Sequence, residues 1–451
     1  MRRLLLGLLL LAAPLRAETL ADALAFAYES SGLLDQNRAL LRAADEDVAQ
    51  AVAALRPIVG WSANLQAAYP GSPLANLTVG DVQVAASIGL NASLTLYDGG
   101  LSRLAVDAQK ELVLATREQL RNAEQQVLLR VVQAYMEVRR VSAFVSLREN
   151  NVRLITQELR AAQDRFDVGE VTRTDVALAE ARLAAARSQL AAEQGGLVRA
   201  VEEFRAAVGR APDGLEPAPA ASIPQGIPEA KAVAQATHPA ILQARHEVAA
   251  AEIAIERAEA AFSPTVTLQG QASLDDSLDD SYGVGLSVQG SVYQGGRLAS
   301  QVRQFVARRD AARAQLLVTA QQVDQNVGNA YASLEVARAS REAFERQVRA
   351  ATVAFNGVRE EATLGARTTL DVLDAEQDLL DARANLVSSE VDEIVSSYVL
   401  LSAMGLLTAE NLGLRVQLYD PTAYYDLVDD APSALSEQGA ALDRVLEALG
   451  R

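Results

Sequence analysis

The feature that most constrains the fold of this chain is an internal duplication. The motif Tyr97-Asp98-Gly99-Gly100 recurs as Tyr293-Gln294-Gly295-Gly296, at a displacement of 293 − 97 = 196 residues. The same displacement carries Ala134-Tyr135 onto Ala330-Tyr331, Gly169 onto Gly365, Asp175-Val176 onto Asp371-Val372 and Ala179-Glu180 onto Ala375-Glu376. Self-similarity at one fixed spacing predicts a structural unit built twice. Because the spacing is far longer than a solenoid repeat, each unit should be a large piece of architecture.

The first residues are typical of an export signal. Met1-Arg2-Arg3 precedes an apolar run from Leu4 to Ala13, and Leu15-Arg16-Ala17 resembles a cleavage site. Together they predict a secretory signal over residues 1–17. A membrane anchor is the alternative, but the run is too short to span ~30 Å of hydrocarbon. No later segment predicts a transmembrane helix, so only strands closed into a barrel could cross a bilayer.

The composition favours long, closely packed helices and excludes several classes of site. The chain has no cysteine, so it has no disulfide framework and no thiolate metal site. A net charge of −17 and an isoelectric point near 4.7 argue against nucleic acid as a partner. Apolar residues make up 50% of the chain but aromatic residues only 4%. The apolar content is therefore mostly alanine, leucine and valine, which suits helices.

Each unit contains two segments in which apolar and polar residues alternate. Every second residue from Val82 to Leu96 is apolar, and Trp61–Tyr69 makes a shorter partner across the loop Pro70–Pro73. The second unit repeats the pattern over Thr265–Gln269 and Val284–Val292, on either side of the acidic loop Asp275–Asp280. A period of two predicts strands with one apolar and one polar face. Each unit is therefore expected to contribute one β-hairpin, over residues 59–97 and 264–293.

These strands favour a membrane barrel shared between chains. Strands of ~9–11 residues or longer, apolar outside and polar inside, are typical of outer-membrane barrels, although a half-buried soluble sheet alternates in the same way. The export signal and the composition favour the barrel. Four strands are too few to close one, because about eight is the practical minimum. Several copies of the chain are therefore expected to share one barrel.

The rest of the sequence predicts long antiparallel helices. No proline occurs between Gly100 and Pro212 or between Gly296 and Pro421, and apolar residues recur in steps of three and four. The first unit is expected to have helices over 20–55, 101–166 and up to about 208, with a turn at 168–170. The second is expected to have helices over 229–261, 298–361 and up to about 404, with a turn at Gly365.

The predicted organisation follows from these elements. The domains expected are a signal peptide (1–17), a first repeat (18–211) with its tip near 169, a linker (212–228), a second repeat (229–408) with its tip near 365, and a C-terminal tail (409–451). In each unit, the shorter segments stacked end to end would match the length of one long helix.

The chain is similar to the TolC family of bacterial outer-membrane channel proteins. The likeness covers essentially the whole mature chain and rests on the duplicated order of helix, hairpin, Gly-Gly corner, long helix, glycine tip and returning helix. Its specific motifs are Tyr97–Gly100, Val168–Val176 and Leu364–Ala375. The resemblance implies a mainly α fold with a membrane β-barrel portion. It also implies a homotrimer, whose twelve-stranded barrel continues as a periplasmic α-helical barrel.

The resemblance further implies a location and partners. Members of the family lie in the outer membrane, in contact with its lipid, and extend into the periplasm. They work with a periplasmic adaptor (membrane fusion) protein and an inner-membrane pump of the ABC or RND type. The chain is therefore expected to be the exit duct of a type I secretion or multidrug efflux system. The alternative is a non-conducting periplasmic coiled-coil scaffold, which would not need four strands between its helices.

No residue pattern favours catalysis or a cofactor. His238 and His246 lie eight positions apart, whereas two metal ligands on one helix face need a spacing of three or four. Neither a G-x-S-x-G nucleophile motif nor a phosphate loop is present. The loop Asp275–Asp280 lacks the regular spacing of calcium ligands. The chain is therefore predicted not to be an enzyme and to have no cofactor and no metal site.

The candidate functional residues lie at the helical tips. Asp371 and Asp374 are three positions apart and share a helix face. The resemblance implies that they form the periplasmic gate and attract cations. Six such carboxylates in a trimer would raise one another's pKa. A carboxylate at a helix start is also favoured by the helix dipole alone. Arg367 matches the family's tip arginine, which implies a link to a neighbouring hairpin near Thr174 and Asp175.

The two tip glycines are expected to meet the adaptor. Gly169 and Gly365 lie where tight turns between antiparallel helices favour glycine, which tolerates positive φ. The family often has a tyrosine where this chain has Ala362. One latch of the closed state is therefore not expected here.

Overall fold

The computed structural model describes residues 18–68, 83–224, 226–433 and 436–448. The predicted export signal and the segment from Tyr69 to Val82, with its loop Pro70–Pro73, lie outside these residues. The described chain is mainly helical with one small sheet, which confirms the coarse fold class.

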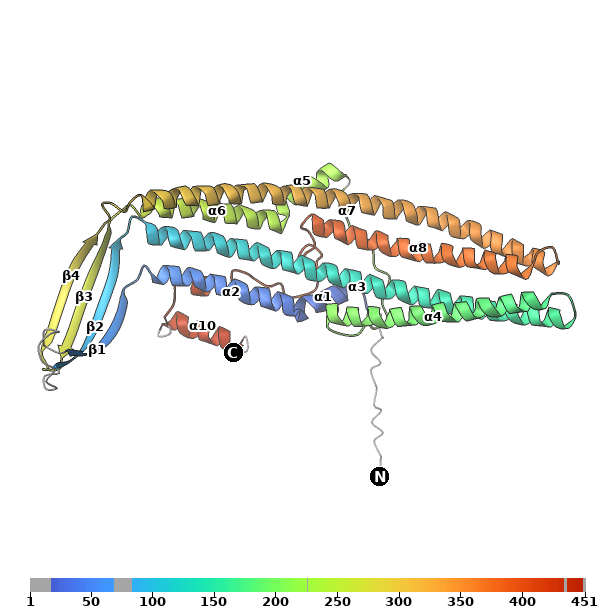
Figure 1. The fold of residues 1–451 in the computed structure, drawn as a ribbon, viewed down its shortest axis with the longest axis horizontal. Helices are drawn as coiled ribbons and strands as arrows, with labels where there is room; N and C mark the ends of the chain where they lie inside the picture. The colour runs from blue at the N-terminus through green and yellow to red at the C-terminus, as the bar shows by residue number, and fades with distance from the viewer. Residues whose placement is uncertain (1–17, 69–82, 225, 434–435, 449–451) are drawn as a thin grey trace, which may run out of the picture. The chain divides into compact units, whose positions relative to one another are not determined.

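Both repeats show the same order of elements (Figure 1). The first contains α1 (Leu20–Ser30), α2 (Gly32–Ala53), β1 (Ile58–Ala68), β2 (Gln83–Tyr97), α3 (Leu101–Asp167) and α4 (Arg173–Val208). The second contains α5 (Ile227–Thr237), α6 (Pro239–Ala260), β3 (Thr265–Asp275), β4 (Asp280–Gln289), α7 (Arg297–Thr363) and α8 (Thr369–Ala403). Two further helices follow, α9 (Tyr425–Val428) and α10 (Glu437–Ala448).

The chain forms two compact units that do not follow the duplication. Among the described residues, unit 1 comprises 18–34, 122–224, 226–238 and 322–418. Unit 2 comprises the described residues of 35–121, 239–321 and 419–448. Each unit takes segments from both repeats, because α3 and α7 each contribute one part to unit 1 and the other to unit 2.

The sheet of unit 2 joins the two predicted hairpins. Its order is β1-β2-β3-β4 and every neighbouring pair is antiparallel. The β2–β3 pairing, with Leu90 opposite Ala272, connects the first repeat to the second. β4 ends at Gln289, three residues before the expected end at Val292. The reason is its partner: Gln289 pairs with Thr265, and the preceding Pro264 has no N–H with which to extend the ladder.

The C-terminal segment packs against the helices of unit 2. Tyr419 and Tyr425 contact a cluster of four buried residues from α2 and α3, which are Leu41, Val48, Val106 and Val113. Tyr424 and Val428 are buried with Ala49 of α2. The segment expected as a tail therefore contributes to the core of this unit, because Tyr424 and Val428 are buried and Tyr419 and Tyr425 are partly buried.

The core of unit 1 is built from α1, α3, α4, α7 and α8. Its largest fully buried side chains include Tyr135, Phe204, Leu128, Leu334 and Leu400. The Tyr135 hydroxyl lies 2.8 Å from the carbonyl oxygen of Glu18 and 2.7 Å from that of Glu216, both of which accept hydrogen bonds. One buried side chain of α3 therefore holds two distant stretches of chain.

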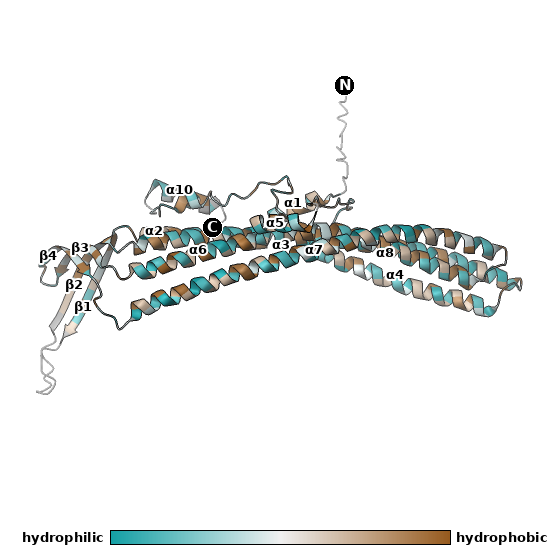
Figure 2. Cartoon of the chain, turned by 90° about the horizontal axis from the view of Figure 1, so that it is seen from above, coloured by the Kyte–Doolittle hydropathy of each residue, from teal (hydrophilic) through white to brown (hydrophobic). Residues whose placement is uncertain are grey.

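The described helices lack the continuous apolar stretch that a membrane-spanning helix requires. Figure 2 shows hydrophilic and hydrophobic residues interspersed along α3 and α7.

The Tyr135 hydroxyl gives a test of the unit 1 core. Tyr135→Phe should lower the free energy of unfolding by about 0.5–1.5 kcal/mol, because it removes the hydroxyl that donates to the carbonyl oxygens of Glu18 and Glu216. Tyr331, the counterpart of Tyr135 in the second repeat, is only half-buried, so Tyr331→Phe should cost less. Guanidinium unfolding followed by circular dichroism measures both variants. Equal losses would contradict the assignment.

Candidate functional site at the helical tips

The turn between α3 and α4 is closed by a glycine in the left-handed region. Gly169 has φ +80°. Its N–H donates to the carbonyl of Phe166 at 2.9 Å, and the N–H of Glu170 donates to that of Arg165 at 2.9 Å. These bonds satisfy carbonyls that the end of α3 would otherwise leave free.

The turn between α7 and α8 has the same construction. Gly365 has φ +76°. Its N–H donates to the carbonyl of Ala362 at 3.1 Å, and the N–H of Ala366 donates to that of Glu361 at 2.9 Å. The two tips are therefore one motif built twice.

Both returning helices begin with a capping box. The hydroxyl of Thr172 accepts from the N–H of Asp175 at 3.3 Å, and the carboxylate of Asp175 accepts from the N–H of Thr172 at 2.9 Å. Thr368 and Asp371 make the same pair of bonds at 3.2 and 2.9 Å. Each box satisfies two backbone donors at a helix start. The spacing Gly-x-x-Thr-x-x-Asp is thus a structural signal at both tips.

The tips themselves are open to solvent. Nothing lies within 4 Å of the position that a Cβ would take at Gly169 or Gly365. The apolar residues just before them, Val168 and Leu364, are 72% and 84% exposed. Each tip therefore presents an apolar side chain beside accessible backbone.

The two predicted gate residues have different surroundings. Hydrogen bonds from the backbone and hydroxyl of Thr368 lower the pKa of Asp371, so its carboxylate stays charged at neutral pH. Asp374, one turn later, accepts from Arg182 of α4 at 2.9 Å. The helix-start interpretation therefore accounts for Asp371 within one chain, while Asp374 connects α8 to the other hairpin.

Within one chain, the predicted link residues Arg367 and Asp175 each bond to a residue of their own hairpin. Arg367 Nε donates to Glu361 Oε2 of its own hairpin at 2.9 Å, and this hydrogen bond is the main cause of a raised Arg367 pKa. Thr174 is exposed in the first turn of α4. The carboxylate of Asp175 is already engaged by Thr172, which lowers the pKa of Asp175.

The start of α8 also packs on the α3–α4 hairpin through residues that the sequence interpretation missed. Leu373 joins an apolar cluster with Ile155, Ala179, Leu183 and Ala186. Three residues later, Glu376 is 6% exposed and accepts from Asn151 Nδ2 of α3 at 2.7 Å. The sequence signal for this contact is the carboxylate of Glu376, which lies between Leu373 and Leu380 in the apolar row of the same helix face.

Ala362, where the resemblance would place a tyrosine latch, takes part in apolar packing. Ala362 is buried in a cluster with Phe355, Val372 and Leu379. A small side chain at this position lets α7 and α8 approach closely just before the tip.

The histidines and the acidic loop do not assemble a metal site. Within the described residues, no group of three or more His, Asp or Glu side chains is placed to hold a metal ion. Burial lowers the pKa of His238, and His246 Nδ1 lies 2.8 Å from Glu111 Oε2. In the acidic loop, Asp275 Oδ1 accepts from the N–H groups of Ser277 and Asp279.

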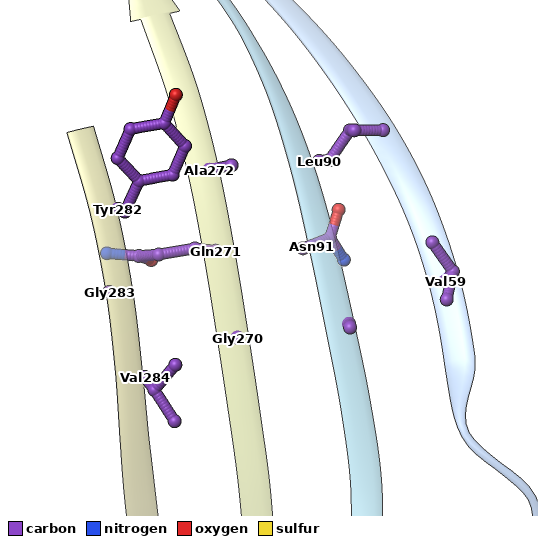
Figure 3. A pocket seen from close by; sticks show the side chains of 10 residues that line it. Val59, Leu90, Asn91, Gly270, Gln271, Ala272, Tyr282, Gly283 and Val284 are labelled. Carbon is purple, nitrogen blue, oxygen red and sulfur yellow. The ribbon is translucent and has the colours of Figure 1, made fainter. Parts of the chain in front are cut away.

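The sheet carries a shallow hollow whose lining is suited to apolar contact. Figure 3 shows Val59, Leu90, Ala272, Tyr282 and Val284 around it. The polar side chains of its lining are the amides Asn91 and Gln271 and the Tyr282 hydroxyl. The lining contains no carboxylate or imidazole side chain.

Comparison with known proteins matches this architecture to one family. The family model described as "Outer membrane efflux protein" matches residues 26–210 and 232–405, that is, both repeats. The outer membrane efflux protein BepC of Brucella suis is 38% identical over 437 residues, covering 95% of this chain and 94% of that protein. The outer membrane protein TolC of Escherichia coli is 26% identical, covering 72% of each chain.

Solved structures show the same fold. The crystal structure of CusC superposes with a TM-score of 0.76 at 20% identity, covering 85% of this chain and 91% of that one. The outer membrane protein VceC of Vibrio cholerae superposes with a TM-score of 0.73 at 23% identity, covering 86% and 96%.

The capping box formed by Thr368 and Asp371 can be tested directly. Thr368→Val removes the hydroxyl acceptor, so amide hydrogens in the first turn of α8 should exchange faster by roughly fivefold, as for the loss of a typical cap. Thr369→Val, one residue into the helix, serves as the control for β-branching. Hydrogen exchange read by mass spectrometry compares the two. Equal exchange in both variants would show that the cap is not what holds this turn.

Proposed function

The chain belongs to the outer membrane efflux protein family, and from this premise we propose that it is the exit duct of a tripartite secretion or efflux system. Its relatives support the coarser statement directly: it is an outer-membrane efflux or secretion channel that extends into the periplasm. The observation that carries the proposal is the duplicated unit, in which a β-hairpin continues into a long helical hairpin with an exposed tip.

The sheet supports a homotrimer with a shared barrel. The sheet of each chain has four strands, with β1 and β4 at its edges. Unpaired edge strands cannot face hydrocarbon, because lipid offers no hydrogen-bond partners. Three sheets joined edge to edge would make a twelve-stranded barrel, within the size range of outer-membrane proteins. Apolar side chains of the sheet such as Leu65 and Val284, 77% and 84% exposed, would then face outer-membrane lipid.

The tips support docking to a periplasmic adaptor, with an inner-membrane pump of the ABC or RND type behind it. Gly169 and Gly365 leave the backbone accessible, and Val168 and Leu364 offer apolar contacts. Among the relatives, AprF of Pseudomonas aeruginosa is named for alkaline protease secretion and CusC of Escherichia coli for cation efflux. The cargo proposed here is whatever the partner pump delivers, a secreted protein or small molecules.

The gate we propose is a ring of Asp371 and Asp374 from three chains. Thr368 keeps the Asp371 carboxylate ionised, which favours attraction of cations. Arg182 neutralises part of the charge of Asp374 within each chain, so Asp371 should contribute more of the ring's field. When the entrance closes, Arg367 would break its hydrogen bond to Glu361 of its own chain. It would then bond to Thr174 and Asp175 of the neighbouring chain.

The ring gives a prediction for conduction. Asp371→Asn combined with Asp374→Asn should abolish block by a trivalent cation added on the periplasmic side and weaken cation selectivity, because the charges are removed. Asparagine is preferred to alanine because its amide oxygen can still cap α8. Single-channel conductance in planar bilayers is the measurement.

A matched control removes two exposed carboxylates from the other hairpin. Glu170→Gln with Glu180→Gln should leave the block unchanged. If the asparagine channel is blocked as strongly as the native one, the ring lies elsewhere. If the native protein inserts no conducting pore at all, the duct is wrong and the scaffold interpretation takes its place.

The tips give a second prediction. Gly169→Val or Gly365→Val should abolish export while the protein still reaches the outer membrane. Both positions have positive φ, so a β-branched residue distorts the turn. Gly357→Val, in the interior of α7 with nothing within 4 Å of its Cβ position, is the control. Export assays in cells expressing each variant decide, and normal export by both tip variants would exclude docking there.

A further inference from the structure

A carboxylate is buried where the two helical hairpins of unit 1 meet. Glu376 of α8 is 6% exposed. Its Oε1 accepts from Asn151 Nδ2 of α3 at 2.7 Å. Its Oε2 is buried and has no hydrogen-bond partner among the described residues. A buried carboxylate oxygen without a donor is costly when the group is charged.

The surroundings of Glu376 are apolar on several sides. Leu373 packs into the α3–α4 cluster with Ile155 and Leu183. On the other side, Leu379 packs with Phe355 of α7, and Leu154 of α3 contacts the same cluster. Glu376 therefore lies in the seam where α8 meets both α3 and α7.

The duplication shows that this contact is particular to one hairpin. The counterpart of Glu376 in the first repeat is Glu180, and the position 196 residues after Asn151 is Gln347. Both Glu180 and Gln347 are exposed. The same repeat pattern thus places one glutamate in water and the other in a seam, two turns or less from Asp371 and Asp374.

We propose that the Glu376–Asn151 contact is a proton-controlled latch that holds the start of α8 against the α3–α4 hairpin and so sets how firmly the periplasmic entrance closes. The inference rests on the proposed channel function. Glu376 acts through the position of α8, which carries Asp371 and Asp374. It is a positioning residue and does not contact the cargo.

The chemistry of the seam sets the direction of the effect. Burial raises the pKa of Glu376 from 4.5 to about 7, the bond from Asn151 opposes this, and the charge of Glu158 on α3 adds to it. The latch is therefore most stable below pH ~4.5 and loses stability as the pH rises through about 7. Protonated Glu376 leaves no buried charge. Ionised Glu376 places a buried negative charge in the seam, which destabilises the contact between α8 and the α3–α4 hairpin.

Three other charged groups near this seam, Arg182, Asp374 and Asp371, are each paired or hydrogen-bonded. Arg182 of α4 is paired with Asp374 of α8, and the pKa of Asp371 is lowered. The residues of α7 that pack here include Phe355, Val358 and Ala362, which are apolar. The Glu376→Gln variant therefore decides whether a transition near neutral pH belongs to Glu376.

The test is the pH profile of conductance in planar bilayers between about pH 5.5 and 8.5, centred on the midpoint near 7. The native channel should conduct several-fold more at the alkaline end. Glu376→Gln keeps an acceptor for Asn151 but cannot ionise, so its conductance should stay at the low, acidic level throughout. Glu180→Gln, the exposed counterpart, should keep the native profile. A flat native profile, or a native-like profile in Glu376→Gln, would overturn the latch.

A second readout does not depend on conduction. The chain has no cysteine, so Val168→Cys and Leu364→Cys accept spin labels at exposed sites on the two tips. The distances between labels should lengthen as the pH rises through about 7, and this response should vanish when Glu376→Gln is added. Unchanged distances in a conducting channel would overturn the latch and leave the function standing. A pH-dependent distance in a protein that conducts no ions would show that α8 moves with pH but would exclude the channel, and with it the gating role of the latch.

Discussion

The pairing of β2 with β3 is the contact on which the rest of this architecture depends. It joins the hairpin of the first repeat to that of the second, so that four strands form one sheet with two outer edges. Each strand of that sheet leads directly into a helix or comes from one, and the β-to-α corners Gly99-Gly100 and Gly295-Gly296 all have positive φ. The sheet order therefore determines the order in which the helices leave it.

The duplication accounts for the helices, strands and tips that the two repeats share. The candidate functional residues lie where the two repeats differ. The two tips share their glycine turn and their capping box, so neither feature distinguishes one hairpin from the other. What differs is the face of the returning helix. The first repeat has Leu178 and an exposed Glu180, where the second has Asp374 and a buried Glu376. Polar groups on the second hairpin are paired with Arg182 and Asn151 of the first.

In the proposed channel, these pairings would give the periplasmic entrance two kinds of electrostatic element. Asp371 and Asp374 are solvated carboxylates, whose interactions are screened and individually weak. Glu376 is removed from water, so its charge state carries a larger energetic consequence. The solvated residues suit attraction of ions, whereas the buried residue suits control of helix position.

The sequence alone determined the duplication, the long helices, the glycine tips, the alternating strands and the resemblance to a channel family, because each depends on a local period or a short motif such as Val168–Val176. Only the tertiary structure decided the β2–β3 pairing, the packing of Tyr419 and Tyr424 onto α2, and the burial of Glu376. These contacts join residues far apart in the chain. Glu180 and Glu376 occupy the same position in the two repeats, so the sequence pattern could not show which of the two carboxylates is buried. That depends on which helix packs beside each of them.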